Sequence, residues 1–582
     1  MASLRRGEKV GEGTYGAVYN AQLPGDRRAL VVKRNFSHPS SSFIQNVREA
    51  DILNRVKGHP HIVEILHYAP TAAFEAPLSP RTSINTSGEL EIVHDDALHF
   101  IFPKSDEDLH TLSNRPGVPG YAALKKYMAH MLLGVEHIHQ KTIVHFDIKP
   151  SNILINSKLV DAVGNVGVAQ ICDFGLARPF TYQEPLGANL CTAIFRPPEL
   201  MMWRPNVDFK VDIWSMACCF FQAITKRHYI PSNFCDLHPT LHEDDALIAE
   251  YIKRVPGGLS MKYRRMILSN NRRKPPPTPF TWPDVKDCPV SLEAMLNLSS
   301  AEKIYFEAQA GPLSQLCDLM EHMMEFDPRR RYSATECLDH PFFNQYRELI
   351  NNTRTAFVAN IPIQHKVYSH PCIERRWGST WLYQLYVAKQ SLSWYHDRVV
   401  FQAWDLYERY LYAMSTQLSP PGFAVESDLQ GFIHSKSDAY LRFLVCLYIS
   451  IKYFNHNIPG WSELVKQIQV VTKVELAGNS EFLAGIIEFG LISECLHYTI
   501  YCPTVYESAD WHQKMHSPED LARLLMLVNR CPNLHGRTVA DIYQHYTSYL
   551  SKHPYDQFHI PITWPAWTHS TCYPDSHTSY YS

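Results

Sequence analysis

Two short segments contain the residue types that phosphoryl transfer requires. Residues 145–152 read His-Phe-Asp-Ile-Lys-Pro-Ser-Asn, and Asp173 opens the triplet Asp-Phe-Gly. Such a set supplies Asp147 to take the proton of a substrate hydroxyl and Lys149 to contact the transferred phosphate. Asn152 and Asp173 offer the oxygen ligands that Mg²⁺ prefers. The spacing therefore predicts a site for phosphate transfer from ATP that is assisted by Mg²⁺.

A glycine-rich segment near the start of the chain predicts a loop that binds the ATP phosphates. The segment Gly11-Glu-Gly-Thr-Tyr-Gly16-Ala-Val18 lies between strand-like stretches, and its glycines let the backbone approach phosphates closely. Leu30-Val-Val-Lys33 follows as a strand whose lysine would pair with the phosphates. Arg48-Glu49 follows on a predicted helix and resembles the kinase segment whose glutamate holds that lysine. The glycine pattern alone is weak evidence, and the ordered partners strengthen it.

The composition is that of an ordinary globular protein. The 582 residues suggest two to four domains, and a net charge of −3 predicts no general attraction to nucleic acid or to an anionic membrane. The 14 cysteines include no Cys-x-x-Cys pair, which disfavours a zinc module or a disulfide scaffold. No signal-peptide core and no apolar run near the length of a membrane span is present. We expect an intracellular protein, cytoplasmic or nuclear, without nucleic-acid or membrane partners.

The elements that would position these residues form a strand-rich part followed by helical parts. Phe43–Val56 places apolar residues at helical spacing, and residues 70–97 look like a loop insertion rich in Pro, Ser and Thr. The pattern is mostly helical from Tyr121 to Phe343, and again from about Pro371 to Tyr549. The predicted strands are Val18–Leu23, Arg28–Val32, Ile62–Leu66 and His99–Phe102.

These motifs, in this order, resemble a eukaryotic protein kinase of the cyclin-dependent type. Besides the glycine-rich segment, they are Cys172-Asp-Phe-Gly-Leu-Ala-Arg178, Thr192-Ala-Ile-Phe-Arg-Pro-Pro-Glu199 and Val211-Asp-Ile-Trp-Ser215. The resemblance spans residues 7–343 and implies an α+β, bilobal kinase fold over 1–345. Its antiparallel β N-lobe would cover 1–103 and its helical C-lobe 104–345. A buried ion pair between Arg331 and Glu199 is also implied.

The resemblance implies a Ser/Thr protein kinase that uses ATP and Mg²⁺ and acts on protein substrates. Thr192 would brace Asp147 and Lys149, with Phe102 as the gatekeeper. Arg196 falls where related kinases favour a proline after the target residue, which suggests Ser/Thr-Pro sites. The residues implied around ATP are Gly11, Glu12, Gly13, Gly16, Val18, Val31, Lys33, Phe102, Pro103, Ser105 and Leu154.

Phe146 departs from the family pattern, which usually has Arg before the catalytic Asp. Arg48 and Arg178 match the other two arginines that clamp an activating phosphate in related kinases. The usual phosphate acceptor falls at Gly187, which carries no hydroxyl. The loss of both partners predicts activity that is independent of activation-loop phosphorylation. A Gly187→Ala variant should therefore stay active.

Two further residues are candidates for regulation. Thr14 and Tyr15 lie in the glycine-rich segment, where related kinases are switched off by phosphorylation. They are equally consistent with being the usual residues of this loop.

The C-terminal half resembles a cyclin box. The matching segments are Arg375-Arg-Trp-Gly-Ser-Thr-Trp-Leu, Tyr407-Glu-Arg-Tyr-Leu, Cys446-Leu-Tyr-Ile-Ser-Ile-Lys-Tyr and Glu494-Cys-Leu-His-Tyr-Thr-Ile-Tyr-Cys-Pro-Thr. By this resemblance Arg375 would pair with Glu408, while Lys452 and Glu488 would contact the kinase. The implied layout is a linker over 346–369, an all-α cyclin-like domain over 370–550 and an irregular tail over 551–582.

A fused cyclin-like domain would activate the kinase within one chain. A tether typically supplies an effective concentration near mM, and residues 344–370 could span roughly 90 Å if fully extended. Activation between chains remains open, as do three other readings. One is a pseudokinase that binds nucleotide without turnover, and another is a scaffold that recruits cell-cycle or transcription partners. The third is a kinase activated by a separate cyclin, with an unrelated helical C-terminal domain.

Overall fold

The computed structural model divides the chain into two compact units. Unit 1 comprises Met1–Ile361 with Lys452–Asn457, and unit 2 comprises Pro362–Ile451 with Ile458–Ser582. The residues that the structure describes are 4–13, 16–35, 42–70, 81–84, 90–93, 98–117, 120–179, 190–201, 208–239, 243–255, 291–357, scattered positions between 381 and 410, 436–454 and 460–472.

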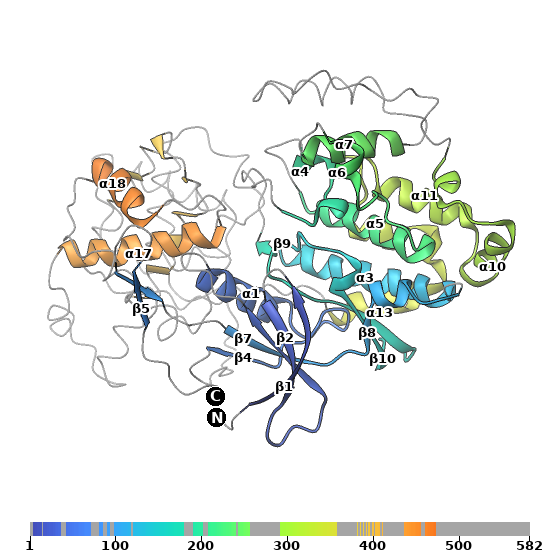
Figure 1. Ribbon diagram of the computed structural model, residues 1–582, viewed down its shortest axis with the longest axis horizontal. Helices are drawn as coiled ribbons and strands as arrows, with labels where there is room; N and C mark the ends of the chain where they lie inside the picture. Colours follow the sequence, from blue (N-terminus) through green and yellow to red (C-terminus); the bar gives the residue numbers. More distant parts are fainter. Residues whose placement is uncertain are drawn as a thin grey trace, which may run out of the picture. The chain divides into compact units, whose positions relative to one another are not determined.

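Unit 1 begins with a five-stranded antiparallel sheet of order β1-β2-β3-β7-β4, at the lower centre of Figure 1. Alternating burial along β3 directs Leu30 and Val32 into the core. Helix α1 (Ser42–Val56) buries Val47, Ile52 and Val56, as its spacing predicts. The strands are β1 (Arg5–Gly13), β2 (Gly16–Gln22), β3 (Leu30–Asn35), β4 (His67–Pro70) and β7 (Leu98–Pro103).

Two predictions in this lobe need correction. Ile62–Leu66 is not a strand, because its backbone bonds go to two different partners: Val63 N–H donates to Ile171 O and Leu66 N–H to Ile101 O. The predicted loop insertion at 70–97 contains a two-stranded hairpin, β5 (Arg81–Ile84) with β6 (Leu90–Val93).

Two small sheets frame the catalytic loop. Strand β9 (Ile143–Val144) pairs with β12 (Arg178–Pro179), and β10 (Ile153–Val160) pairs with both β11 (Val166–Ile171) and β8 (Glu107–Asp108). The loop therefore leaves one sheet and enters the next within a few residues. Its last part is the 3₁₀ turn η2 (Pro150–Asn152).

The second lobe of unit 1 is helical. Helices α3 and α5 form its centre, and along α5 every residue from Val211 to Ile224 is buried. Shorter helices surround them and have defined caps, such as the Ser299 capping box at which α10 begins. The helices are α2 (Leu109–Ser113), α3 (Tyr121–Gln140), α4 (Pro198–Met201), α5 (Val211–Thr225), α6 (Phe234–Leu237), α7 (Glu243–Arg254), α9 (Leu292–Leu296), α10 (Ser300–Ala310), α11 (Leu313–Met323) and α12 (Ala334–Asp339), with 3₁₀ segments η3 (Ala193–Phe195) and η6 (Pro341–Tyr346).

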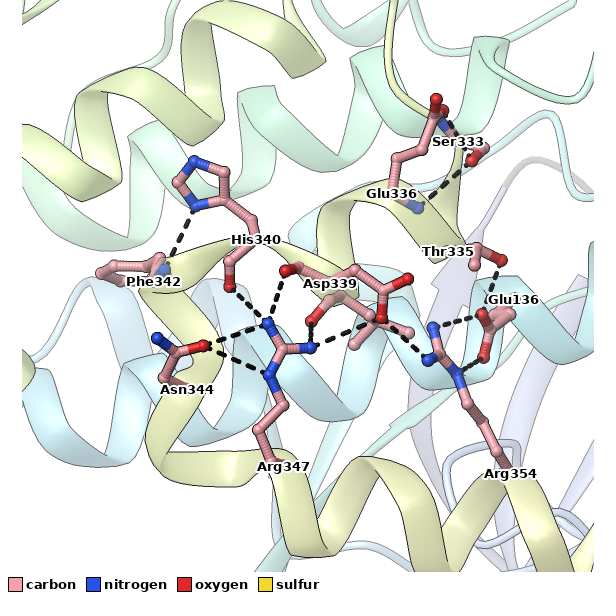
Figure 2. A network of polar contacts seen from close by, with 11 residues as sticks. Glu136, Ser333, Thr335, Glu336, Asp339, His340, Phe342, Asn344, Arg347 and Arg354 are labelled. Carbon is pink, nitrogen blue, oxygen red and sulfur yellow. Dashed lines mark hydrogen bonds and ion pairs between the residues drawn. The ribbon is translucent and has the colours of Figure 1, made fainter.

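Unit 1 continues beyond residue 345 as helix α13 (Arg347–Ala356). Figure 2 shows Arg354 of this helix between Glu136 of α3 and Asp339 of α12. Arg354 Nε and Nη2 donate to the two Glu136 oxygens at 2.9 and 2.8 Å, and Nη1 donates to Asp339 at 2.9 Å. Leu349 and Ile350 of the same helix are buried. Residues 347–356, within the range predicted as a linker, are therefore a packed helix.

The main elements in the described part of unit 2 are helix α18 and helix α17 up to Ile451, while the last residues of α17 are counted with unit 1. Helix α17 (Lys436–Phe454) is largely buried, as its apolar run predicts, and α18 (Trp461–Thr472) follows it. Tyr440 joins them through its hydroxyl and Thr472 Oγ1 at 2.5 Å, and Trp381 packs edge-on against Tyr440 at 4.9 Å. Among the described residues of the whole chain, no helix is long and apolar enough to cross a membrane.

Candidate active site

A buried lysine lies between two carboxylates at the junction of β3 and α1. Lys33 Nζ donates to Glu49 Oε1 at 2.7 Å and to Asp173 Oδ1 at 2.6 Å. Burial alone would lower the pKa of Lys33, but the charges of Asp173 and Glu49 outweigh it and raise that pKa. Asn35 supports the arrangement by donating to Glu49 Oε2 at 2.9 Å. The lysine is thus held in its charged form, which an anionic phosphate requires.

Asp147 is the centre of a second cluster, formed by the catalytic loop and the activation segment. Its Oδ2 accepts from Lys149 Nζ at 2.7 Å, and its Oδ1 accepts from Thr192 Oγ1 at 2.7 Å. Lys149 also donates to Thr192 at 3.2 Å, which closes a triangle. Asn152 Nδ2 donates to the backbone carbonyl of Asp147 at 2.8 Å. The structure therefore brings together four residues that the sequence predicts.

The carboxylate of Asp212, on α5, fixes the backbone of this loop. The carboxylate of Asp212 accepts the N–H groups of His145 and Phe146, both at 2.9 Å, and lies 2.9 Å from His139 Nε2. Phe146 has φ 61°, a conformation that non-glycine residues adopt at a cost. The two hydrogen bonds offset this cost and hold Asp147 in place.

The glycine-rich loop and the strands beside it place the residues predicted to surround ATP. Val18 pairs with Lys33 across β2 and β3, and Val31 pairs with Phe102 across β3 and β7. A Cβ atom at Gly16 would lie 2.5 Å from the carbonyl oxygen of Arg34, so only glycine fits there. The predicted set is partly or fully accessible, apart from the buried Gly16 and Lys33: Gly11, Glu12, Val18, Val31, Phe102, Pro103, Ser105 and Leu154.

The donor set fits a Mg²⁺-nucleotide. Asp173 presents a carboxylate, and burial raises its pKa less than Lys33 lowers it, so it is ionised. The amide nitrogen of Asn152 is directed to Asp147, and its amide oxygen is therefore the atom offered to a cation. Asn152 and Asp173 would hold the metal, which neutralises charge on phosphate oxygens when bound.

The activation segment returns to the described part of the chain at Leu190. Arg196 Nε donates to the carbonyl of Leu190 at 3.0 Å, and Nη2 donates to that of Cys191 at 3.2 Å. Cys191 has φ 69°, which turns its peptide out of the usual extended course. Asp244 of α7 accepts from Arg196 Nη1 at 2.8 Å. Arg196 therefore occupies two carbonyls beside Thr192.

Phe146 lies in an apolar cluster, called here the Phe146 cluster. Its buried members come from β9, the catalytic loop, the activation segment, α4 and α5, and Leu176 and Phe209 pack against them. They are Val144, Phe146, Leu190, Cys191, Leu200 and Val211. The position where related kinases have a phosphate-binding arginine is thus occupied by a ring that packs with the activation segment.

Arg48 and Arg178, the other two predicted members of the phosphate pocket, are both buried, on α1 and β12, which lie against each other. Within unit 1, Arg48 Nη1 donates to the carbonyl of Tyr453 at 3.1 Å. Tyr453 in turn donates its hydroxyl to Asp51 of α1 at 2.7 Å. Two groups of Tyr453 therefore engage helix α1, next in sequence to Lys452, which the resemblance predicts to contact the kinase.

The ion pair predicted between α4 and the end of the kinase domain is confirmed. Arg331 Nη1 and Nη2 donate to the two oxygens of Glu199 at 2.6 and 2.9 Å, and both side chains are fully buried.

Several predicted residues lie outside the described part of the chain. They are Thr14, Tyr15, Gly187, Arg375, Glu408 and Glu488. Gly13 is described only as the end of β1.

Sequence reasoning missed three residues that the structure places next to this site. Asp212 lay in a quoted motif, and its carboxylate could have been noticed there. Tyr453 also lay in a quoted motif, but nothing local distinguishes it from Lys452. Asp244 carries no motif, and only the fold brings it to Arg196.

Comparisons with known proteins agree with this geometry. The family model of the protein kinase domain matches residues 4–343. The chain is 29% identical over 353 residues to "Probable cyclin-dependent kinase 8" of Dictyostelium discoideum, covering 58% of this chain and 80% of that protein. It is 30% identical over 231 residues to "Cyclin-dependent kinase C-3" of Oryza sativa subsp. japonica, covering 39% and 65%. It is 26% identical over 344 residues to "Serine/threonine-protein kinase crk1" of Schizosaccharomyces pombe, covering 58% and 83%.

Among solved structures, a chain of the CAK complex from Chaetomium thermophilum bound to ATP-gamma-S matches with a TM-score of 0.42 and 24% identity. The match covers 59% of this chain and 91% of that chain.

The chain belongs to the protein kinase family. Within it, the chain is a protein-serine/threonine kinase of the cyclin-dependent type. A kinase domain uses ATP and Mg²⁺ and acts on protein substrates.

Proposed function

We propose that this kinase phosphorylates Ser/Thr-Pro sites and needs no phosphate on its activation loop, because its own C-terminal half supports helix α1. The observation that carries the proposal is the pair of contacts around Phe146 and Arg48. Phe146 packs with the activation segment, and Arg48 donates to the Tyr453 carbonyl at 3.1 Å. Both positions would contribute to a phosphate clamp in related kinases.

The proposed chemistry follows from the Asp147 cluster. Asp147 accepts or orients the proton of the substrate hydroxyl, and Lys149 contacts the phosphate that moves. Thr192 fixes both through its hydroxyl. Lys33, held by Glu49, contacts the phosphates of ATP. Asn152 and Asp173 hold Mg²⁺.

The proposed preference for proline follows from the carbonyls beside Thr192. Arg196 occupies the carbonyls of Leu190 and Cys191, so the N–H of the residue after the target would find no acceptor there. Leaving a buried donor unpaired costs about 1–3 kcal/mol. Proline has no N–H and avoids this cost. A target followed by proline would therefore be favoured.

The proposed independence from phosphorylation rests on permanent apolar contact. In a phosphate clamp, arginines draw the activation loop to the catalytic loop only after a charge is added. The Phe146 cluster instead joins Val144 to Leu190 and Cys191 without any added group. Burial of apolar surface contributes about 25 cal/mol per Å². The activation segment would be held in place as soon as the chain folds.

The proposed role of the C-terminal half is to hold helix α1 so that Glu49 meets Lys33. Tyr453 engages Arg48 through its carbonyl and Asp51 through its hydroxyl, on both sides of Glu49 in sequence. A buried guanidinium and a buried carboxylate both need such partners, because an unpaired buried charge is costly. We expect this activation to occur within one chain, with a cyclin-like domain over 370–550 as its source.

The test uses the full-length chain with MgATP and a Ser-Pro peptide. Wild type should phosphorylate the peptide, and Asp147→Asn should not. Specific activity should stay constant as the protein is diluted, whereas activation between chains predicts a loss. Mass spectrometry of the same sample should find activity in molecules without activation-loop phosphate. A kinase that works only after phosphorylation of Thr181 or Tyr182 would overturn the proposal.

A further inference from the structure

Helix α7 forms hydrogen bonds with Arg196 at two points. Asp244, in its first turn, accepts from Arg196 Nη1 at 2.8 Å, and Tyr251 donates its hydroxyl to the backbone carbonyl of Arg196 at 2.7 Å. Residues 244 and 251 are two helical turns apart and so lie on the same face. One face of α7 therefore fixes both the side chain and the main chain of Arg196.

The contact between Asp244 and Arg196 is buried, and the other nearby carboxylate, Glu243, is farther away and more exposed. The side chain of Asp244 is 12% exposed and that of Arg196 is 9% exposed, whereas Glu243, 3.8 Å from Arg196, is 50% exposed. A charge-assisted hydrogen bond of this kind is stronger than a neutral one, and more so away from water. Removing Asp244 would leave the guanidinium with a weakly placed carboxylate.

The rest of the Arg196 environment does not replace this contact. The other two guanidinium bonds go to the carbonyls of Leu190 and Cys191. Carbonyls carry no full charge, so they offset less of the cost of burying the arginine than a carboxylate does. Without Asp244 we expect the guanidinium to turn toward Glu243 and water, which weakens its bonds to both carbonyls.

We propose that Asp244 is a positioning residue for substrate selection: it holds Arg196 on the two carbonyls and thereby sets the preference for proline after the target Ser or Thr. This inference rests on the proposed Ser/Thr-Pro specificity and deepens it. It assigns the selection to a residue of α7, outside the activation segment. Tyr251 helps to hold Arg196 in the same position, because its hydroxyl donates to the backbone carbonyl of Arg196.

The experiment measures kcat/KM of the full-length chain on three peptides that differ only after the target serine. The three residues are proline, alanine and N-methylalanine, which lacks the N–H but has no ring. Wild type should prefer proline and N-methylalanine over alanine by roughly 5- to 150-fold, the factor expected for one unpaired buried donor. Asp244→Ala should lower this ratio at least fivefold, mainly by raising the relative use of alanine.

Matched variants separate selection from stability. Asp244→Asn keeps the shape of the side chain and should shift the ratio in the same direction, so it serves if the alanine variant does not fold. Tyr251→Phe removes only a hydroxyl and should also lower the ratio, by a smaller factor. Asp245→Asn makes the same charge change one position along α7 and should leave the ratio unchanged.

The outcomes distinguish this inference from the proposed function. Wild type without any preference for proline would overturn the proposed Ser/Thr-Pro specificity itself. Suppose that wild type shows the preference, but the Asp244 variants lower kcat/KM equally on all three peptides. This result would overturn the role of Asp244 and would leave the proposed specificity unaffected. A ratio that falls in the Asp244 variants and not in Asp245→Asn would support the inference.

Discussion

Two buried regions that meet at the catalytic loop are built from opposite chemistry. Around Asp147 and Lys33 the contacts are charged, with Nζ–O distances of 2.6–2.7 Å. Around Phe146, one residue before Asp147, the contacts are apolar, and they reach the activation segment at Leu190 and Cys191. The chain keeps charges where phosphate chemistry requires them. We propose that apolar packing acts where a phosphate would act in related kinases.

The difference suggests what can and cannot be regulated at this site. An arginine clamp responds to a kinase and a phosphatase, because the phosphate can be added and removed. An apolar cluster responds to neither. We therefore expect activity to fall strongly when a charge is removed around Asp147 or Lys33. Around Phe146, we expect activity to fall when a polar or charged side chain is introduced.

The largest expected effect comes from Asp147→Asn, which breaks the charged region. General acid–base groups contribute about 10²–10⁴-fold to rate, so kcat should fall by that range. The melting temperature should stay close to wild type, because Asn can keep the bonds to Lys149 and Thr192. Retained nucleotide binding is the control. Near-wild-type turnover by this variant would show that Asp147 does not act on the substrate hydroxyl.

The next largest effect is on stability and tests a charge pair that is structural. Glu199→Gln leaves the buried guanidinium of Arg331 without its carboxylate and should cost about 3–5 kcal/mol. The matched control is Glu293→Gln, which breaks the exposed pair with Lys303 at 2.6 Å and should change stability far less, because water screens an exposed pair. Both are measured by denaturant unfolding. Equal losses would contradict the distinction between buried and exposed pairs.

Phe146→Arg breaks the apolar region by restoring the residue that related kinases use. A charge placed among Val144, Leu190 and Val211 should loosen the activation segment and lower activity more than tenfold. Phe146→Leu keeps the cluster apolar and should cost only about 1–2 kcal/mol of stability, with most activity retained. Full activity of the arginine variant, with or without phosphorylation, would argue against the packing account.

The stacked histidines form a third buried group, and their effect on stability can be measured as a function of pH. His59 stacks on His137 at 4.6 Å, and His61 stacks on His130 at 4.2 Å. Burial lowers the pKa of His59 and His61 well below 6.5, and that of His137 to about 4. Between about 6.5 and 4 the unfolded chain binds more protons than the folded one, so stability should fall as pH falls.

The slope should reach about 1.4 kcal/mol per pH unit for each such histidine. His137→Phe keeps the stacked ring without the titrating group and should flatten the curve. An unchanged slope in this variant would show that other groups cause the acid sensitivity.

The smallest effect is expected from Tyr453→Phe. It removes the hydroxyl bond to Asp51 and leaves the carbonyl bond to Arg48, so activity should fall only by a few fold. Tyr453→Ala also removes the packed ring and should fall further. Activity unchanged in both variants would argue that Tyr453 does not hold α1.

The sequence predicted the charged region well because its parts are local motifs. Asp147, Lys149 and Asn152 lie within one short loop, and Lys33, Glu49 and Thr192 each lie in a recognisable segment. Helices with clear apolar spacing, such as Phe43–Val56, were also predicted.

What the sequence did not predict depends on contacts between distant segments. Asp244 reaches Arg196 only because α7 lies against the activation segment. Ile62–Leu66 has the composition of a strand, but its backbone bonds are divided between β11 and β7. Residues 347–356 read as a linker, although Arg354 and two buried apolar residues fix them as a helix. No local pattern states which partner such residues will meet.

The most direct test of the central claim is the activity of the full-length kinase after treatment with a broad-specificity phosphatase. Mass spectrometry should first establish that the activation loop carries no phosphate. The account predicts that kcat/KM on a Ser-Pro peptide then equals that of the untreated enzyme. Loss of activity on dephosphorylation, with recovery after an activating kinase is added, would contradict it.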